Sequence, residues 1–282
     1  MADQNIQNNL LEHLRQLVRE RDPYMASGGH FFVKQYIRQT LTQWGNVTTH
    51  DFEYQGRQHQ NLLLNLPARQ PKSQDLILIA AHYDGVPGSP AADDNATGVA
   101  VLLELARMIQ SQPLAYPVQL VAFDLEEYGL IGSRAYVKQL KSQNRGIRLM
   151  LSLEMLGYYD ASPNSQKYPA GLELIYPDTG DFIALVGNFR TLLDLWQMSD
   201  AIRRTGTKCE WLPSPNRGLW VPQTRLSDHA PFWDEGYPAV MVTDTAFLRN
   251  PHYHQPSDRL ETINLDFLSG VCTGLGAALA GL

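Results

Sequence analysis

Two stretches near the start of the chain carry apolar residues at the spacing of an α-helix. An apolar residue occupies every fourth position from Ile6 to Val18, and a second helical run spans about 31–44 before Gly45. This spacing gathers apolar side chains on one face of a helix, and a glycine directly after such a run favours its end. We therefore predict two amphipathic helices that pack on a sheet.

Farther along, apolar strands alternate with amphipathic helices. Short strands are predicted around 47–54 and 61–66, and residues 76–84 begin with the continuous apolar run LILIAA. A fully apolar strand is typical of burial on both faces of a parallel sheet. The pattern then predicts a helix over about 97–110, a strand at 118–124, a helix over about 133–143 and a strand at 148–156. This alternation indicates an α/β fold, a mostly parallel mixed sheet sandwiched between helices.

The segment after Gly157 is rich in proline and aromatic residues. Within it, residues 208–224 are predicted to form a structured loop rather than a helix or strand. A strand at 238–245 and a terminal helix over about 265–279 complete the pattern. The sequence has 282 residues, of which 44% are hydrophobic, and no linker or repeat interrupts it, so we expect a single domain over 1–282.

Composition narrows the classes of partner. The chain has 29 acidic and 23 basic residues, a formal charge of −6, and its basic residues are scattered, which argues against nucleic acid. The polar N-terminus resembles neither a signal peptide nor a membrane span, so a cytoplasmic protein without membrane association is expected. Cys209 and Cys272 are far apart in the sequence and are predicted to be free thiols. The composition predicts no oligomeric state.

Residue types that bind metals follow several of the predicted strands. His82 and Asp84 end the first apolar strand, Glu126 and Glu127 follow the second, and Glu154 closes the third. Taken singly, each has an ordinary explanation, such as a surface histidine or an acidic helix start. In an open parallel sheet, however, these positions meet at one edge where ligands bind. Buried carboxylates that meet there need a cation between them, so the pattern predicts a metal site.

The spacing within this group indicates roles. In His82-x-Asp84, the imidazole would bind a metal while Asp84 orients the ring through its other nitrogen. Glu126 and Glu127 are adjacent and point in different directions, so one can bind metal while the other faces the substrate. This division suits a catalytic base beside a metal ligand.

Two further segments offer ligands, and their residues alone leave the choice open. Asp94 lies in a turn before an apolar helix, where it either bridges two ions or belongs to a cluster that caps the helix. His252 and His254 share an irregular segment and are equivalent candidates. Two imidazoles and several carboxylates without thiolates favour Zn(II), with Mn(II) or Co(II) as possible substitutes. Five ligands exceed one open zinc site and indicate a two-metal centre.

The order of these motifs resembles the di-zinc peptidase family that contains the bacterial leucyl aminopeptidases, glutamate carboxypeptidase, the glutaminyl cyclases and the transferrin receptor. The matching segments lie between about 76 and 258 and read AAHYD, ADDNATG, FDLEEYGLIGSRAYV, SLEMLGYY, SDHAPFWDEGYPAV and YHQPSD. The resemblance implies a zinc exopeptidase fold with two Zn(II) per chain. It assigns one ion to Asp94, Glu127 and His254, and the other to His82, Asp94 and Glu154.

The same resemblance implies further details of the site. Asp94 would bridge the two ions, the Asp94–Asn95 peptide would be cis, and Asp228 and His229 would lie behind the metal ligands. The sequence departs from the family pattern at Glu154, where the well-known aminopeptidases carry Asp. Because this position is close to where a substrate's amino group binds, substrate specificity does not transfer from those relatives.

The resemblance makes aminopeptidase the leading activity, with a small peptide carrying a free N-terminus as substrate. Glu126 is expected to act as the general base on a water shared by the two zinc ions, supported by Asp84. The alternatives are a glutaminyl-peptide cyclotransferase with one zinc and a non-catalytic binding module of the same fold.

A carboxypeptidase or dipeptidase is the remaining alternative. Arg217 and Arg225 would then grip a substrate α-carboxylate, although both are equally typical of surface arginines. Trp211, Trp220 and Trp233 would line a hydrophobic substrate pocket or, as the simpler interpretation, pack in the core and loops.

Overall fold

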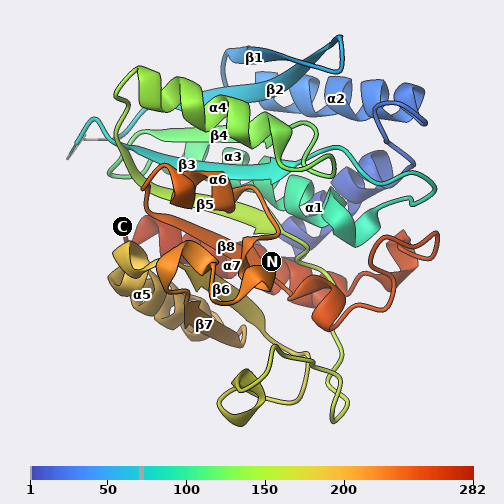
Figure 1. Cartoon of the computed structure of the whole chain (residues 1–282), viewed down its shortest axis with the longest axis vertical. Helices are drawn as coiled ribbons and strands as arrows, with labels where there is room; N and C mark the ends of the chain where they lie inside the picture. The colour runs from blue at the N-terminus through green and yellow to red at the C-terminus, as the bar shows by residue number, and fades with distance from the viewer. Residues whose placement is uncertain (1, 70–72) are drawn as a thin grey trace.

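A computed structural model of the chain describes residues 2–69 and 73–282. Within these residues, eight strands form one sheet in the order β1-β2-β4-β3-β5-β8-β6-β7 (Figure 1). The strands are β1 (Val47–Tyr54), β2 (Arg57–Leu66), β3 (Leu76–His82), β4 (Val118–Phe123), β5 (Ile147–Glu154), β6 (Ile183–Gly187), β7 (Cys209–Pro213) and β8 (Ala239–Thr243). The α-helices are α1 (Ala2–Leu17), α2 (Ser27–Thr42), α3 (Gly98–Ser111), α4 (Ile131–Ser142), α5 (Leu192–Arg204), α6 (His229–Asp234) and α7 (Leu265–Ala280).

The sheet is mixed, with a parallel centre. Strand β3 pairs in parallel with β4 and β5, and β5 pairs in parallel with β8. Strands β1 and β2 add an antiparallel hairpin at one side, and β6 runs antiparallel to β8 at the other. Because β3, β4, β5 and β8 all run the same way, their carboxyl ends lie at one edge of the sheet. The predicted α/β fold with a mixed sheet between helices is confirmed.

Helices cover both faces of this sheet. In Figure 1, α4 and α6 lie in front of the sheet, while α1, α3, α5 and α7 lie behind it. Successive side chains of a strand point to opposite faces, so Ile77 and Ile79 pack in the core behind the sheet, and Leu78 and Ala80 in the core in front of it. The fully apolar sequence of β3 follows from this burial on both sides.

The predicted amphipathic character of the first helix is confirmed. Leu10, Leu14 and Leu17 of α1 are fully buried in the core behind the sheet. Both cysteines are free, as predicted, and both are buried. No helix among the residues that the structure describes is long and apolar enough to cross a lipid bilayer.

The prediction of a loop over residues 208–224 is wrong at its start. Cys209–Pro213 forms β7, which pairs in parallel with β6 at the edge of the sheet. Strand β6 and helix α5 in the preceding segment were also not predicted. Strand β7 is only partly buried, so its sequence lacks an apolar run. It pairs with β6, the preceding strand, and the β-propensity of a short segment does not predict such a pairing.

Candidate metal centre

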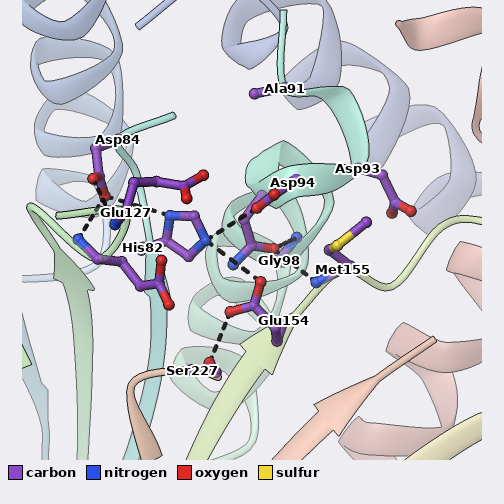
Figure 2. Close-up of polar contacts among 12 residues, drawn as sticks. His82, Asp84, Ala91, Asp93, Asp94, Gly98, Glu127, Glu154, Met155 and Ser227 are labelled. Atoms are coloured by element: carbon purple, nitrogen blue, oxygen red, sulfur yellow. Dashed lines mark hydrogen bonds and ion pairs between the residues drawn. The ribbon is translucent and has the colours of Figure 1, made fainter. Parts of the chain in front are cut away.

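The predicted ligands gather at the carboxyl edge of the sheet. His82 ends β3, Glu126 and Glu127 follow β4, and Glu154 ends β5. Asp94 belongs to the short segment Ala92–Thr97 that leads into α3. Figure 2 shows the His82 ring pointing toward both Asp94 and Glu154. The βαβ topology therefore brings together residues that are up to 72 positions apart in the sequence.

Asp94 stands between two groups of side chains. Its Oδ1 lies 3.3 Å from His82 Nε2, and that nitrogen is 3.5 Å from Glu154 Oε1. Its other oxygen, Oδ2, lies 3.0 Å from His254 Nε2, which is 3.2 Å from Glu127 Oε2. The two carboxylate oxygens thus face different histidines, each accompanied by its own glutamate.

The donor atoms of this cluster lack ordinary partners. Within residues 2–69 and 73–282, both ring nitrogens of His82, Asp94 Oδ2 and Glu127 Oε1 are buried without a hydrogen bond. One donor atom from each of these three residues lies within 4.8 Å of the others. Buried polar atoms are normally paired, and a cation would satisfy His82 Nε2 and the two carboxylate oxygens. Imidazole nitrogens and carboxylate oxygens without thiolates fit zinc.

Burial and crowding shift the pKa values in this cluster. Burial raises the pKa of Glu127 to about 7, with the Asp94 charge adding to the effect. Burial also raises the pKa of Glu126 well above its ordinary value, helped by Glu154 and Glu127. Although burial lowers the pKa of His254, its contacts with Asp94 and Glu127 raise that pKa to about 10. The carboxylates around His254 thus favour a positive charge at this point of the cluster.

Asp84 supports the centre from behind. Its Oδ1 accepts the backbone N–H of Glu126 at 3.1 Å, and its Oδ2 accepts that of Glu127 at 3.2 Å. The same carboxylate lies 3.4 Å from His82 Nδ1. The sequence predicted only the contact with the histidine. The structure adds that Asp84 holds the backbone of the two glutamates.

Asp258 holds the segment that carries Asp94. Its carboxylate accepts the backbone N–H groups of Asp93 at 2.9 Å and Asp94 at 3.1 Å. The Asp94–Asn95 peptide is cis, as the resemblance implies. No role for Asp258 was predictable from the sequence, because a side chain that binds backbone groups far away in the sequence leaves no local pattern.

Ser227 is a second residue that the sequence analysis missed. Its hydroxyl donates to Glu154 Oε2 at 2.7 Å, as Figure 2 shows, and lies 2.9 Å from the Ser152 hydroxyl. Ser227 is fully buried. The only local signal was its position beside Asp228 in a motif that the resemblance already used.

The two residues expected behind the ligands differ in their surroundings. Asp228 is fully buried, and no hydrogen bond from the described residues reaches its carboxylate oxygens. Burial raises its pKa to about 7. His229 instead contacts the carbonyl of Thr224 at 2.8 Å and packs edge-on against Trp233. Burial lowers the pKa of His229 to about 3, which favours a neutral ring.

The structure separates the two histidines that the residues alone left equivalent. His252 is directed to the Ser257 hydroxyl at 2.9 Å, away from the cluster. His254 faces Asp94, and its ring stacks on Tyr253 with centroids 3.7 Å apart. Tyr253 also lines the cavity beside the cluster. Nothing in the sequence distinguished this tyrosine from its neighbours.

A cavity of about 950 Å³, counted with its open mouth, begins at the cluster and extends over β8, β6 and β7. Its apolar lining includes Leu172, Phe182, Val186, Leu212, Leu226 and Met241. Of the three tryptophans considered from the sequence, Trp211 lines this cavity, Trp220 is 72% exposed, and Trp233 is buried in the core. The simpler interpretation, packing, therefore holds for Trp233.

The arginines considered as carboxylate ligands do not line the cavity. Arg225 donates to the backbone carbonyl of Arg217 and to the Asp234 carboxylate. Neither Arg217 nor Arg225 is among the described residues that line the cavity. The structure thus does not support a carboxypeptidase in which these two arginines bind the substrate's α-carboxylate.

Known proteins share this fold and sequence pattern. The chain is 37% identical over 257 residues to the uncharacterized protein YfbL of Escherichia coli, covering 86% of this chain and 77% of that protein. The structure of BSAP, a zinc aminopeptidase from Bacillus subtilis, superimposes with a TM-score of 0.61 at 26% identity, over 81% of this chain. The chain spans about half of BSAP, 51% of its length.

The fold also occurs with a different chemistry. A glutaminyl cyclase from Bacteroides thetaiotaomicron superimposes with a TM-score of 0.71 over 98% of both chains, at 15% identity. That likeness concerns the fold alone. The sequence profile of peptidase family M28 matches residues 61–274, which include all five predicted ligands and Glu126. The matched range covers most of the chain and confirms the expected peptidase family. The chain belongs to peptidase family M28.

Proposed function

We propose that the chain is a zinc-dependent aminopeptidase that removes N-terminal residues from peptides. The observation that supports this most is the convergence of two histidines and two glutamates around Asp94, with Glu126 lining the same cavity. A metal pair beside a carboxylate that binds no metal is an arrangement suited to amide hydrolysis.

In this proposal, one ion is held by Asp94, Glu127 and His254, and the other by Asp94, His82 and Glu154. The contacts of Asp94 support the division, because each of its oxygens faces a different histidine. When bound, the two zinc ions would lower the pKa of a shared water and polarise the scissile carbonyl. Mn(II) or Co(II) suit the same donor set.

Glu126 acts as general base and then as general acid. Its carboxylate takes the proton of the attacking water and delivers it to the departing amine. Asp84 contributes by fixing the Glu126 backbone and by orienting the His82 ring. The hydrogen bond from Ser227 fixes the carboxylate of Glu154 in the same way.

The charge of the site favours a substrate with a free amine. Glu126, Glu127 and Glu154 together line the inner end of the cavity. With zinc bound, the metal charge offsets that of the ligands Glu127 and Glu154, so the attraction for a protonated α-amino group rests on Glu126, which binds no metal. Because neither Arg217 nor Arg225 lines the cavity, the described lining offers no bidentate partner for a carboxylate.

Three matched substrates test the proposal on the zinc-loaded protein. Leucyl-, N-acetylleucyl- and glutaminyl-peptides would be incubated with it and analysed by mass spectrometry. The proposal predicts release of leucine from the free peptide, no cleavage of the acetylated peptide, and loss of activity with a chelator that zinc restores. Cleavage of the acetylated peptide at its C-terminus, or loss of ammonia from the glutaminyl peptide without hydrolysis, would contradict it.

A further inference from the structure

A row of four side chains crosses the floor of the cavity. Glu154 of β5 pairs in register with Thr243 of β8, Thr243 with Ala184 of β6, and Ala184 with Glu210 of β7. Residues paired in register project from the same face of a sheet. The row therefore begins at the metal centre and ends in a second carboxylate at the sheet edge.

The row forms a trough between its two acidic ends. Neighbouring strands lie about 4.8 Å apart, so three steps separate the Cα atoms of Glu154 and Glu210 by about 14 Å. Thr243 and Ala184 are short and leave space above the floor. The next row on the same face consists of Met241, Val186 and Leu212, which are apolar and also line the cavity.

Glu210 brings a negative charge to the far end of this trough. Among the described lining residues, it is the only acidic residue outside the metal centre. Its side chain is 31% exposed, so it is partly removed from water. It lies close to Tyr176, whose pKa is raised by burial and by the Glu210 charge. The far end of the trough thus combines a carboxylate with an aromatic wall.

One cation of the chain already approaches Glu210, but only loosely. Arg203 Nη2 lies 3.4 Å from Glu210 Oε2, while Arg203 Nε donates to the Cys209 carbonyl at 2.7 Å. A charge-assisted hydrogen bond is normally shorter, about 2.7–2.9 Å. Among the hydrogen bonds of the described residues, none reaches Glu210 Oε1. One oxygen of Glu210 therefore remains available to a ligand.

We infer that the cavity selects peptides whose N-terminal residue has a long side chain ending in a positive charge, lysine or arginine. This inference rests on the proposed aminopeptidase function. The aliphatic stem of such a side chain packs over Met241, Val186 and Leu212, as amphipathic side chains commonly do. Its cationic end meets the free oxygen of Glu210. A purely apolar side chain of the same length would cover that carboxylate without pairing it, which is unfavourable.

Lysyl and norleucyl 4-nitroanilides provide the test, because the two side chains differ only in the terminal ammonium group. For the zinc-loaded protein, we expect kcat/KM to be about tenfold higher for the lysyl substrate, the effect of one hydrogen bond between charged groups. Glu210→Gln should lower the lysyl value by about tenfold, whereas the norleucyl value should not fall, because the neutral amide leaves no unpaired charge under the apolar side chain. Zinc content and Tm of the variant should match those of the wild type.

Arg203→Gln is the matched control, because it removes the competing cation and keeps Glu210. The inference predicts a higher kcat/KM for the lysyl substrate in this variant. If Glu210 and Arg203 formed only a structural ion pair, both substitutions would lower turnover of both substrates alike, and the inference would be wrong. Equal turnover of the two substrates by the wild type overturns the inference and leaves the proposed function standing. Failure to hydrolyse either one overturns both.

Discussion

Glu126 occupies the position from which a proton can be moved during hydrolysis. It follows β4 directly, its backbone N–H is held by Asp84, and its side chain lines the cavity beside the proposed metal ligands. In the proposed division of the donor set, Glu126 is the one glutamate at the inner end of the cavity that binds no metal. Its role can therefore be separated experimentally from metal binding.

Replacement of Glu126 by Gln should abolish most activity while zinc remains bound. The amide keeps the size of the side chain but accepts no proton, so kcat should fall by about 10³-fold, within the usual range for general acid–base catalysis. Steady-state kinetics and atomic absorption on the same sample measure both quantities. Glu53→Gln, an exposed change on β1, is the control. Substantial activity in the Glu126→Gln protein would remove this residue from the mechanism.

Ser227 offers a test of how Glu154 is positioned. Ser227→Ala removes the hydroxyl that donates to Glu154 Oε2, so zinc affinity should fall by about tenfold, as is typical when a group supporting a metal ligand is lost. Competition with a fluorescent chelator measures the affinity. Ser152→Ala breaks only the contact between the two hydroxyls and should have the smaller effect. Equal zinc affinity in the wild type and Ser227→Ala would show that the hydrogen bond does not matter.

At the scale of the elements, Arg21 joins the end of α1 to the segment that leads to Asp94. The guanidinium group is fully buried and donates to the carbonyls of Tyr83, Pro90 and Ala91. Burial lowers its pKa, and the surrounding carboxylates, Asp94 first among them, partly oppose this. Arg21 thus satisfies backbone groups and places a positive charge behind the metal centre.

Arg21→Met should be strongly destabilising, because several buried carbonyl groups would lose their donor. We expect the free energy of unfolding to fall by about 3 kcal/mol. Urea denaturation of the zinc-free protein measures this without a contribution from metal binding. Arg15→Met, at a side chain 54% exposed, serves as the control and should change the value by less than about 0.5 kcal/mol. Similar effects of the two substitutions would contradict this role of Arg21.

Asp124 joins three elements through two histidines. Its carboxylate lies 2.8 Å from His30 Nε2 of α2 and 3.0 Å from His59 Nδ1 of β2, and Asp124 itself directly follows β4. Burial alone would raise the pKa of Asp124, but the contacts with His30 and His59 outweigh it and lower the pKa to about 2. Folding therefore favours the ionised carboxylate.

This depressed pKa predicts how stability depends on pH. The contribution of Asp124 is fully present above the unfolded-state pKa of about 3.9 and is lost as the pH falls through the folded-state pKa. Near pH 6, the zinc-free wild type should exceed Asp124→Asn in unfolding free energy by about 2 kcal/mol. Urea denaturation at several pH values should show that this difference in unfolding free energy shrinks as the pH falls from about 5 to about 2. A difference that stays constant over this window would contradict the assignment.

The sequence predicted the elements best where burial imposes a clear pattern. The alternation from β3 to β5 was recognisable because these central strands are apolar along their whole length. The segment from β6 to β7 was not predicted, since β7 is a short edge strand whose residues are only partly buried. The part of the cavity floor that β6 and β7 form therefore came only from the structure.

The residues of the candidate site also differ in whether the sequence pattern predicted them. His82, Glu127 and Glu154 were visible as ligand types at the ends of apolar strands. Asp94 and His254 lie in irregular segments, and their selection needed the family resemblance. Ser227 and Asp258 bind a ligand side chain or backbone groups far away in the sequence, so no local pattern marks them.

At the scale of the whole molecule, one sheet positions both the proposed metal ligands and the floor of the cavity beside them. Its parallel centre ends in the proposed metal ligands. Strands β6 and β7, which extend the sheet beyond β8 (Figure 1), continue the cavity floor from these ligands to Glu210. The same fold occurs in a glutaminyl cyclase at a TM-score of 0.71. Because one fold supports different reactions, the function of this chain must be argued from its site.

The central claim is that Asp94 bridges two metal ions held by His82, Glu154, Glu127 and His254. Anomalous diffraction at the zinc absorption edge, from crystals of the zinc-loaded protein, tests it most directly. We predict two anomalous peaks, about 3.5–4 Å apart, each beside a different oxygen of Asp94. A single peak, or two peaks of which either lies away from Asp94, would contradict the proposed centre.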